Sequence, residues 1–332
     1  MAALSERQLV SLLGQRFQTR SPGVRVGIGD DAAVLEPQPE PWVCSVDASV
    51  EGVHFDLAFL TLEDVGYRAF QAAISDLAAM GATPVAALSA LILPRGLSST
   101  AISALASGQA VASSETACPV VGGNISRGKE LSVTTTVLGC GATPLCRGGA
   151  QPGEQLWLVG SLGLAAAGLA ALRLGRARVP ARSEEPCVDG PEPPSTSIAA
   201  LERCVAAWRR PRALLSEGRG LVGRASAVID VSDGLAADAW QLARASRARI
   251  VVDRERLRAA LDASLIAASR SLRRSPLHFA VYGGEDYALL ATGPSSARPA
   301  WARAIGYVTR GTGAFLSGPG LVPLRRGYDH FT

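Results

Sequence analysis

Aspartates set directly beside apolar segments are the feature that most restricts how this 332-residue chain can fold. Asp47 and Asp230 each follow a short apolar run, and further acidic motifs occupy a glycine turn at 27–31 and a helical pattern at 75–76. A carboxylate is seldom placed against an apolar strand unless something offsets its charge. We therefore expect these acidic groups to lie at strand ends or turns, where ligands collect in folds built of helices and strands.

The bulk composition is that of an ordinary globular chain. Hydrophobic residues make up 48% and charged residues 19%, which excludes wholesale disorder, and the length suits two domains. The formal net charge of +4 raises the question of nucleic acid. However, the arginines are scattered and form no basic run interleaved with aromatic residues, so we expect no nucleic-acid partner.

Cysteines, histidines and apolar runs exclude several other classes. The six cysteines show no C-x-x-C spacing and the three histidines lie far apart, which argues against structural zinc. The first residues read as an amphipathic helix with internal charges and not as an export signal. The longest apolar run, 85–93, is too short to span a bilayer. We expect a cytoplasmic protein with reduced thiols and no membrane partner.

Hydrophobic periodicity predicts strands and helices in alternation along the chain. A change to glycine and proline at 147–153 predicts a domain boundary, and the proline-rich stretch 176–197 reads as a surface insertion. Strands 119–121 and 131–138 are predicted to form a pair joined through a Gly-Gly turn. The other predicted strands are 42–46, 85–93, 156–159, 227–229, 250–252 and segments near Ala280 and Tyr287. The predicted helices are 62–80, 98–116, 164–174 and 234–245.

Magnesium is the cation that the acidic motifs favour, because it prefers oxygen ligands and often bridges carboxylates to nucleotide phosphates. Each motif alone has an ordinary alternative. Asp30 and Asp31 could form a capped turn, Asp76 could be a solvated helical residue, and Asp233 could simply cap a helix. Their joint occurrence favours a metal site.

Other residues predict contacts to phosphate and to a polar substrate. The glycines before Asn124 would let backbone amides approach a phosphate, or could form a simple hairpin. Arg147 could clamp a phosphate or lie on the surface, and Glu285 could hold a polar or cationic group. No P-loop, G-x-S-x-G elbow or protein-kinase signature is present. Any nucleotide phosphates must therefore be held by acidic residues with metal.

The motifs taken in order resemble the thiamine-monophosphate kinase family, over residues 27–331. The resemblance implies an α+β, two-domain PurM-like fold, as in aminoimidazole-ribonucleotide synthetase. It implies that residues 1–146 bind ATP and metal and dimerise through a β-barrel, followed by an α/β domain at 147–332. The motifs are GIGDDAAV, SVDASVEGVHF, SDLAAMGA, VGGNISRG, RGGAQPGE, IDVSDGL, GGEDY and GYDHF.

The resemblance also implies a role for individual residues. Asp47, Asp76, Asp230 and Arg147 would be catalytic. ATP phosphates would contact Gly123, Asn124, Arg147 and Ser232, and the substrate would contact His54, Glu285 and Tyr328. Magnesium would be bound by Asp30, Asp31, Ser45, Asp47, Asp76, Asn124, Asp230 and Asp233. One departure is Asn124, which stands where the family usually has aspartate and brings an oxygen without a charge.

The implied reaction is direct in-line transfer of the ATP γ-phosphoryl group to thiamine monophosphate, giving thiamine diphosphate, with several Mg²⁺ ions in a homodimer. Two alternatives remain open. The chain could be another ATP-using synthetase of the same superfamily. It could also be a nucleotide-binding regulator with impaired catalysis, which Asn124 favours.

Overall fold

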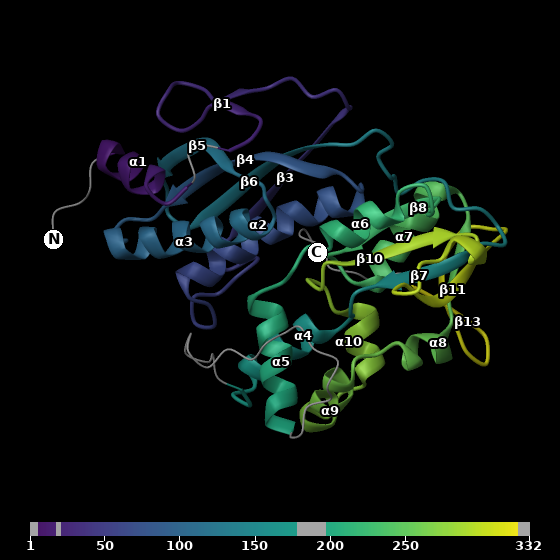
Figure 1. Ribbon diagram of the computed structural model, residues 1–332. Helices are drawn as coiled ribbons and strands as arrows, with labels where there is room; N and C mark the ends of the chain where they lie inside the picture. The colour runs from purple at the N-terminus through teal and green to yellow at the C-terminus, as the bar shows by residue number, and fades with distance from the viewer. Residues whose placement is uncertain (1–5, 18–20, 178–196, 325–332) are drawn as a thin grey trace. The chain divides into compact units, whose positions relative to one another are not determined.

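The computed structural model describes residues 6–17, 21–177 and 197–324, so Tyr328 and nearly all of the expected insertion at 176–197 lie outside the described residues. The chain divides into two compact units (Figure 1). The first comprises residues 1–77 and 82–142, and the second comprises 78–81 and 143–332. Within the described parts of the chain, no helix is both long and apolar enough to cross a membrane.

The first unit is built on a four-stranded sheet with the order β3-β6-β4-β5. β6 runs antiparallel to both of its neighbours, whereas β5 is parallel to β4 and follows it through the crossover helix α3. A small β1–β2 ribbon precedes the sheet. The elements are α1 (Glu6–Gly14), β1 (Val24–Val26), β2 (Val34–Leu35), β3 (Trp42–Val50), α2 (Leu62–Ala79), β4 (Thr83–Leu93), α3 (Ser99–Glu115), β5 (Val120–Arg127) and β6 (Ser132–Cys140).

Helices α2 and α3 lie along one face of this sheet (Figure 1). Phe70, Ile74 and Leu77 recur at helical spacing on α2 and are fully buried; burying a side chain of this size stabilises a fold by about 1.5–3 kcal/mol. The two helices cross at glycines. A Cβ on Gly66 would lie 2.0 Å from the Leu105 carbonyl oxygen, so the close approach requires a residue without a side chain.

The other face of the sheet carries exposed apolar side chains. Side chains alternate along a strand, so Cys44 and Val46 share a face, and the strand register adds Leu88 and Ile92 to it. Val46 is 61% exposed and Ile92 42% exposed in the single chain. We call these four residues, Cys44, Val46, Leu88 and Ile92, the open face.

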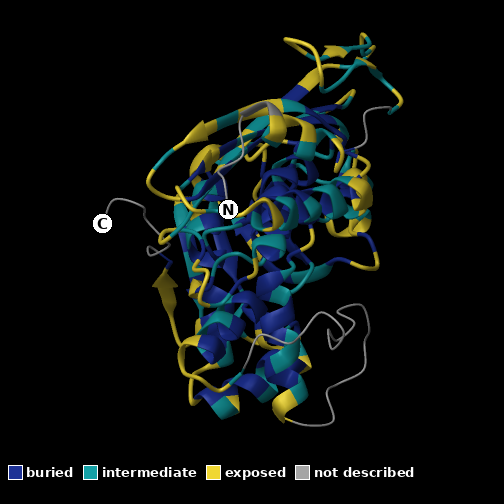
Figure 2. Cartoon of the chain, turned by 90° about the vertical axis from the view of Figure 1, so that its left-hand side faces the viewer, coloured by how far each residue is buried: buried dark blue, intermediate teal, exposed yellow. Residues whose placement is uncertain are grey.

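The second unit is built on a seven-stranded sheet with the order β13-β12-β9-β11-β7-β10-β8, in which only β9 and β12 pair in parallel among the described strands. Buried positions run along the inner sides of helices and strands, and exposed ones gather at turns (Figure 2). The elements are β7 (Gln155–Val159), α4 (Leu164–Arg173), α5 (Ser197–Arg209), α6 (Leu215–Leu221), β8 (Ala227–Val231), α7 (Leu235–Ser246), β9 (Arg249–Val252), α8 (Arg254–Ala259), α9 (Ala263–Leu272), α10 (Pro276–Tyr282), β10 (Ala288–Gly293), β11 (Arg303–Thr309), β12 (Gly313–Ser317) and β13 (Leu321–Pro323).

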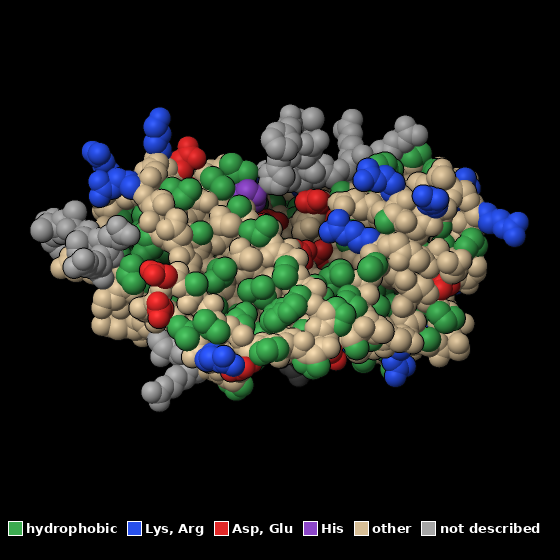
Figure 3. Space-filling model, turned by 90° about the horizontal axis from the view of Figure 1, so that it is seen from above, with side chains coloured by type: hydrophobic (Ala, Val, Ile, Leu, Met, Phe, Trp, Pro, Cys, Tyr) green, Lys and Arg blue, Asp and Glu red, His purple; other side chains and the backbone are tan. Residues whose placement is uncertain are grey.

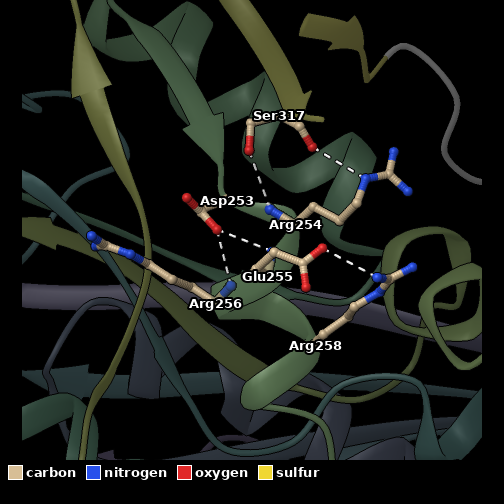
Figure 4. A network of polar contacts seen from close by, with 6 residues as sticks. All are labelled: Asp253, Arg254, Glu255, Arg256, Arg258 and Ser317. Atoms are coloured by element: carbon tan, nitrogen blue, oxygen red, sulfur yellow. Dashed lines mark hydrogen bonds and ion pairs between the residues drawn. The ribbon is translucent and has the colours of Figure 1, made fainter. Parts of the chain in front are cut away.

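Local polar contacts fix where helix α8 begins (Figure 4). Asp253 caps the helix by accepting hydrogen bonds from the backbone N–H groups of Glu255 and Arg256 at 3.0 and 2.9 Å. Arg254 donates through its backbone and its Nε to the hydroxyl and carbonyl oxygens of Ser317 at the end of β12. The start of α8 is therefore tied to the sheet.

The predicted helices 62–80, 98–116, 164–174 and 234–245 are confirmed, as are the strands 85–93, 156–159 and 250–252, with small changes at their ends. The predicted turn at Gly122-Gly123, and the pairing of the flanking strands, are wrong. β5 runs through both glycines and pairs with β4 instead of β6. A Cβ on Gly123 would lie 1.8 Å from the Ser89 carbonyl oxygen, so glycine here permits close strand contact.

Two other predictions need correction. The strand from Trp42 does not end at Asp47, because its alternation continues to Val50 and Asp47 lies inside β3. The segment near Ala280 is helical and belongs to α10. Its start signal is Ser275 followed by Pro276, an N-cap and a proline whose missing N–H costs nothing in the first turn of a helix.

Candidate functional site

The first unit brings Ser45 and Asp76 into contact. The Ser45 hydroxyl donates to Asp76 Oδ2 across 2.5 Å, joining β3 to α2. Asp47 is two positions along β3 and therefore points to the same side of the sheet as Ser45. Thr135, its partner on β6, is fully buried on that side. These residues thus form an oxygen-rich group on the helix-covered side of the sheet.

Asn124 lies on the opposite side of the sheet from Ser45 and Asp47. The register aligns it with Ala90 on β4, in the row that leads to Ala48 on β3. Its side-chain nitrogen donates to Ser126 Oγ at 3.2 Å. Within one chain, the sheet does not bring Asn124 to the Ser45–Asp76 pair.

The remaining predicted residues of this unit lie in loops. Asp30 and Asp31 are exposed, and the Asp30 carboxylate accepts the backbone N–H of Asp31 at 2.8 Å. His54 follows β3, where its Nδ1 accepts the backbone N–H of Val50 at 3.1 Å. This contact fixes the orientation of the imidazole ring.

The second unit gathers three carboxylates around the end of β8. Asp230 is buried on β8, Asp233 lies in the turn that follows, and Asp238 is buried on α7. The Asp233 backbone N–H donates to Asp238 Oδ2 at 3.1 Å. Burial, followed by the charges of Asp233 and Asp230, raises the pKa of Asp238 to about 8, although the hydrogen bond and Arg147 oppose the rise. Crowding of this kind favours a nearby cation.

Arg147 is held against α7 at the edge of this cluster. Its Nη1 donates to Gln241 Oε1 at 3.0 Å, and Gln241 Nε2 lies 3.5 Å from Asp238 Oδ1. Ser246 at the end of α7 donates to the Arg147 carbonyl oxygen at 3.1 Å. Gln241 is therefore a neutral link between a guanidinium and a buried carboxylate.

The sequence interpretation missed Asp238 and Gln241. The one available signal was an aspartate in the apolar pattern LAADAW, one turn after Gly234 on a predicted helix. Charged residues are rarely buried without partners, so a carboxylate on the apolar side of a helix marks a functional or structural contact.

Glu285 lies beside the end of β8 because its loop, 283–287, is bonded to that strand. The backbone N–H groups of Glu285 and Tyr287 donate to the carbonyl oxygens of Ser232 and Val231 at 2.7 and 3.0 Å. Glu285 and Tyr287 both have positive φ, 66° and 49°, which is uncommon for residues with side chains and often marks a functional site. Ser232 and Glu285 are thus neighbours.

Among the described residues, no group of three or more His, Cys, Asp and Glu side chains is arranged so that it could hold a metal ion. Lys and Arg side chains are dispersed in the view of Figure 3 and do not gather into one band. The donors that the sequence singles out are carboxylate, hydroxyl and amide oxygens, which suit Mg²⁺ better than a softer metal.

Comparison with known proteins places the chain among its relatives. Residues 29–141 match the family described as AIR synthase related protein, N-terminal domain. The thiamine-monophosphate kinase of Aquifex aeolicus is 30% identical over 99% of this chain and 98% of its own length. The chain belongs to the thiamine-monophosphate kinase family. The resemblance inferred from the sequence motifs is therefore confirmed.

Solved structures of the thiamine-monophosphate kinase family share the fold. The crystal structure of thiamine-monophosphate kinase from Stenotrophomonas maltophilia superimposes with a TM-score of 0.80 at 30% identity, covering 95% of this chain and 97% of that one. The structure of AaThiL complexed with AMPPCP and TMP gives a TM-score of 0.77 at 30% identity and covers 100% of this chain and 99% of that one. The expected α+β, PurM-like fold is confirmed.

Proposed function

We propose that this protein is an ATP-dependent kinase that converts thiamine monophosphate to thiamine diphosphate. The observation that carries the proposal is the end-to-end likeness to AaThiL, which was solved with AMPPCP and TMP. AMPPCP has the shape of ATP with a bridging carbon that resists transfer. The Asp230 cluster, Arg147 and the loop of Glu285 supply the kinds of groups that such a reaction needs.

The proposed chemistry is one in-line displacement. An oxygen of the thiamine monophosphate phosphate forms a bond to the γ-phosphorus of ATP, and the bond from that phosphorus to the β–γ bridging oxygen breaks, releasing ADP. The attacking oxygen is already anionic, so no general base is needed and no phosphoenzyme forms. The obstacle is the repulsion between the two anionic phosphates. Arg147 lowers this repulsion by binding phosphate, and Gly123 and Ser232 are further phosphate contacts.

Magnesium fits the oxygen donors of this chain. The proposed ligands are Asp30, Asp31, Ser45, Asp47 and Asp76 in the first unit and Asp230 and Asp233 in the second. Asn124 is also proposed as a ligand, but it lies on the other side of the sheet from Ser45 and Asp47, so within one chain it would not share an ion with them. Mg²⁺ bound there would neutralise phosphate charge and orient the reacting oxygens. Asp47, Asp76, Asp230 and Arg147 are the residues we propose as catalytic.

The proposed thiamine contacts are His54, Glu285 and Tyr328, of which Tyr328 lies outside the described residues. The thiazolium ring of thiamine carries a permanent positive charge, which suits a carboxylate such as that of Glu285. The hydrogen bond that orients His54 would hold its ring ready for the phosphate end of the substrate.

We propose a homodimer that acts in the cytoplasm, with residues 1–146 binding ATP and metal and 147–332 forming the second domain. The apolar open face supports the dimer. Exposed apolar side chains on a sheet without a covering layer are typical of a contact surface, and a second copy would complete a β-barrel.

The test is a coupled assay of the purified protein. We expect ADP and thiamine diphosphate to form in equal amounts, and only when ATP, thiamine monophosphate and Mg²⁺ are all present. Arg147→Ala should lower kcat/KM at least about a hundredfold, because one charge-assisted phosphate contact contributes about 3 kcal/mol. ATP consumption independent of thiamine monophosphate would favour another synthetase of the superfamily. ATP binding without turnover would favour the regulator suggested by Asn124.

A further inference from the structure

Two helices of the second unit hold the loop 283–287 through adjacent side chains. Asp286 accepts the backbone N–H groups of Gly163 and Ala165 at 2.5 and 3.1 Å, at the start of α4. The preceding residue, Glu285, accepts the indole N–H of Trp208 through Oε2 at 2.9 Å. Trp208 lies on α5 and is only 2% exposed. One loop is thus bound to both helices.

The loop 283–287 is packed closely against neighbouring backbone atoms. A Cβ on Gly283 would lie 2.4 Å from the Phe279 carbonyl oxygen, and one on Gly284 would lie 2.5 Å from the Ser232 carbonyl oxygen. Helices α4 and α5 are also in close contact, because a Cβ on Gly168 would lie 2.1 Å from the Cys204 carbonyl oxygen. The backbone under Glu285 and the helix that carries Trp208 are therefore both closely packed against neighbouring backbone.

A glutamate side chain is long and flexible, so each fixed partner reduces the number of directions that its carboxylate can take. The indole N–H can only donate, and a carboxylate accepts strongly from it. Trp208 is held by burial, so its N–H offers one fixed point. The contact thus selects one direction for the Glu285 carboxylate.

We infer that Trp208 is a positioning residue whose indole N–H orients the Glu285 carboxylate toward the substrate and thereby sets substrate affinity. This inference rests on the proposed function, in which Glu285 contacts thiamine monophosphate. Trp208 itself touches no reacting atom. Its effect belongs to the binding of thiamine monophosphate and leaves ATP binding unchanged.

The experiment compares two tryptophan variants. Trp208→Phe keeps an aromatic ring and removes the N–H. Trp157→Phe is the matched control, because Trp157 is fully buried on β7 and its N–H donates to Gln155 at 3.3 Å, outside the proposed site. We expect Trp208→Phe to raise KM for thiamine monophosphate about tenfold with KM for ATP unchanged, and Trp157→Phe to change neither.

A double-mutant cycle identifies the partner. Glu285→Gln weakens the acceptor without altering α5, so it also tests the contact should Trp208→Phe fold poorly. Combined with Glu285→Gln, Trp208→Phe should add little further increase in KM. Independent, multiplicative effects would overturn the inference, as would a Trp208→Phe enzyme whose two KM values rise together.

Thermal unfolding of the four proteins of the cycle, which are the wild type, Trp208→Phe, Glu285→Gln and the double variant, separates this inference from the proposed function. If the wild type does not phosphorylate thiamine monophosphate, the proposed function fails. Non-additive shifts in unfolding midpoint would then still support the Trp208–Glu285 contact as a positioning device for another substrate. Additive shifts would overturn the contact even in an enzyme that is active.

Discussion

Gln241 shows at the scale of one residue how a neutral side chain organises charges. Its amide oxygen accepts from Arg147 and its amide nitrogen faces Asp238. A carboxylate at this position would face Asp238 with a like charge, and an apolar side chain would release the guanidinium. An amide is the group that satisfies both neighbours.

We expect Gln241→Leu to raise KM for ATP by about tenfold while KM for thiamine monophosphate stays near its wild-type value, because Arg147 loses its fixed direction. Steady-state kinetics with each substrate varied in turn measure this. Gln151→Leu is the control, since Gln151 is exposed and bonds only the Gly149 carbonyl oxygen through its side chain. Equal changes in both KM values would contradict the assignment.

Asp286 makes stability depend on pH. The residue is only partly buried by surface area, yet its carboxylate is enclosed, and burial raises its pKa from 3.8 to about 7 against the hydrogen bonds from Gly163 and Ala165. Between about pH 4 and 7 the folded protein therefore holds a proton that the unfolded chain releases. This contribution to stability is complete below pH 4 and is lost as the pH rises to 7.

We expect Asp286→Asn to remove a slope of about 1.4 kcal/mol per pH unit from the free energy of unfolding between pH 4 and 7. Urea denaturation of both proteins at a series of pH values measures the difference. Above pH 7 the two curves should run parallel. A difference that does not vary with pH would show that Asp286 has no raised pKa.

The sequence pointed to some residues of the candidate site and not to others, for a physical reason. Ser45, Asp76 and Asp230 belong to motifs whose hydroxyl and carboxylate groups indicate metal binding. Gln241 and Trp208 belong to ordinary helical patterns, and each gains its meaning from a partner far away in the sequence. No local pattern encodes such a pairing.

At the scale of elements, the close crossing of α2 and α3 limits which residues can occupy positions 66 and 108. Gly66 and Gly108 each lie against a carbonyl oxygen of the other helix, with Cβ distances of 2.0 and 1.9 Å. Alanine would favour either helix alone by about 1 kcal/mol. The clash with backbone cannot be relieved by rotating a side chain. An alanine at either position would therefore destabilise the protein despite its higher helix propensity.

We expect Gly66→Ala to lower the free energy of unfolding by about 2–3 kcal/mol, as overpacking does in a tight interface. Chemical denaturation of the variant measures this. The control is Gly220→Ala on α6, where the nearest neighbour is the side chain of Trp301 at 3.1 Å, which can move aside. A stabilised Gly66→Ala protein would contradict the crossing.

Element types were easier to predict than their pairing. Apolar residues at helical spacing located α2, because the burial of one helix face is visible in the sequence, and an alanine-rich run of small residues located α3. The placement of β5 beside β4 was not predicted. The glycines of β5 resembled a turn locally, and the reason for them is the Ser89 backbone on a neighbouring strand.

At the scale of the whole molecule, the open face leads to a prediction about the oligomeric state. We expect Val46→Glu to shift the protein from dimer to monomer in sedimentation velocity, because a charge would be buried in an apolar contact. Val322→Glu is the control, on a residue of β13 that is 49% exposed and lies outside the open face. A Val46→Glu protein that sediments like the wild type would show that the open face is not the dimer contact.

Cys44 gives the open face a chemical reporter. It lies on the same face of β3 as Val46, and both Cys44 and Cys146 are exposed, free thiols. If a second copy covers the sheet, alkylation of Cys44 slows as protein concentration rises, while Cys146 keeps its rate as an internal reference. Peptide mapping after a short pulse of iodoacetamide could then follow subunit exchange in the untouched wild-type protein.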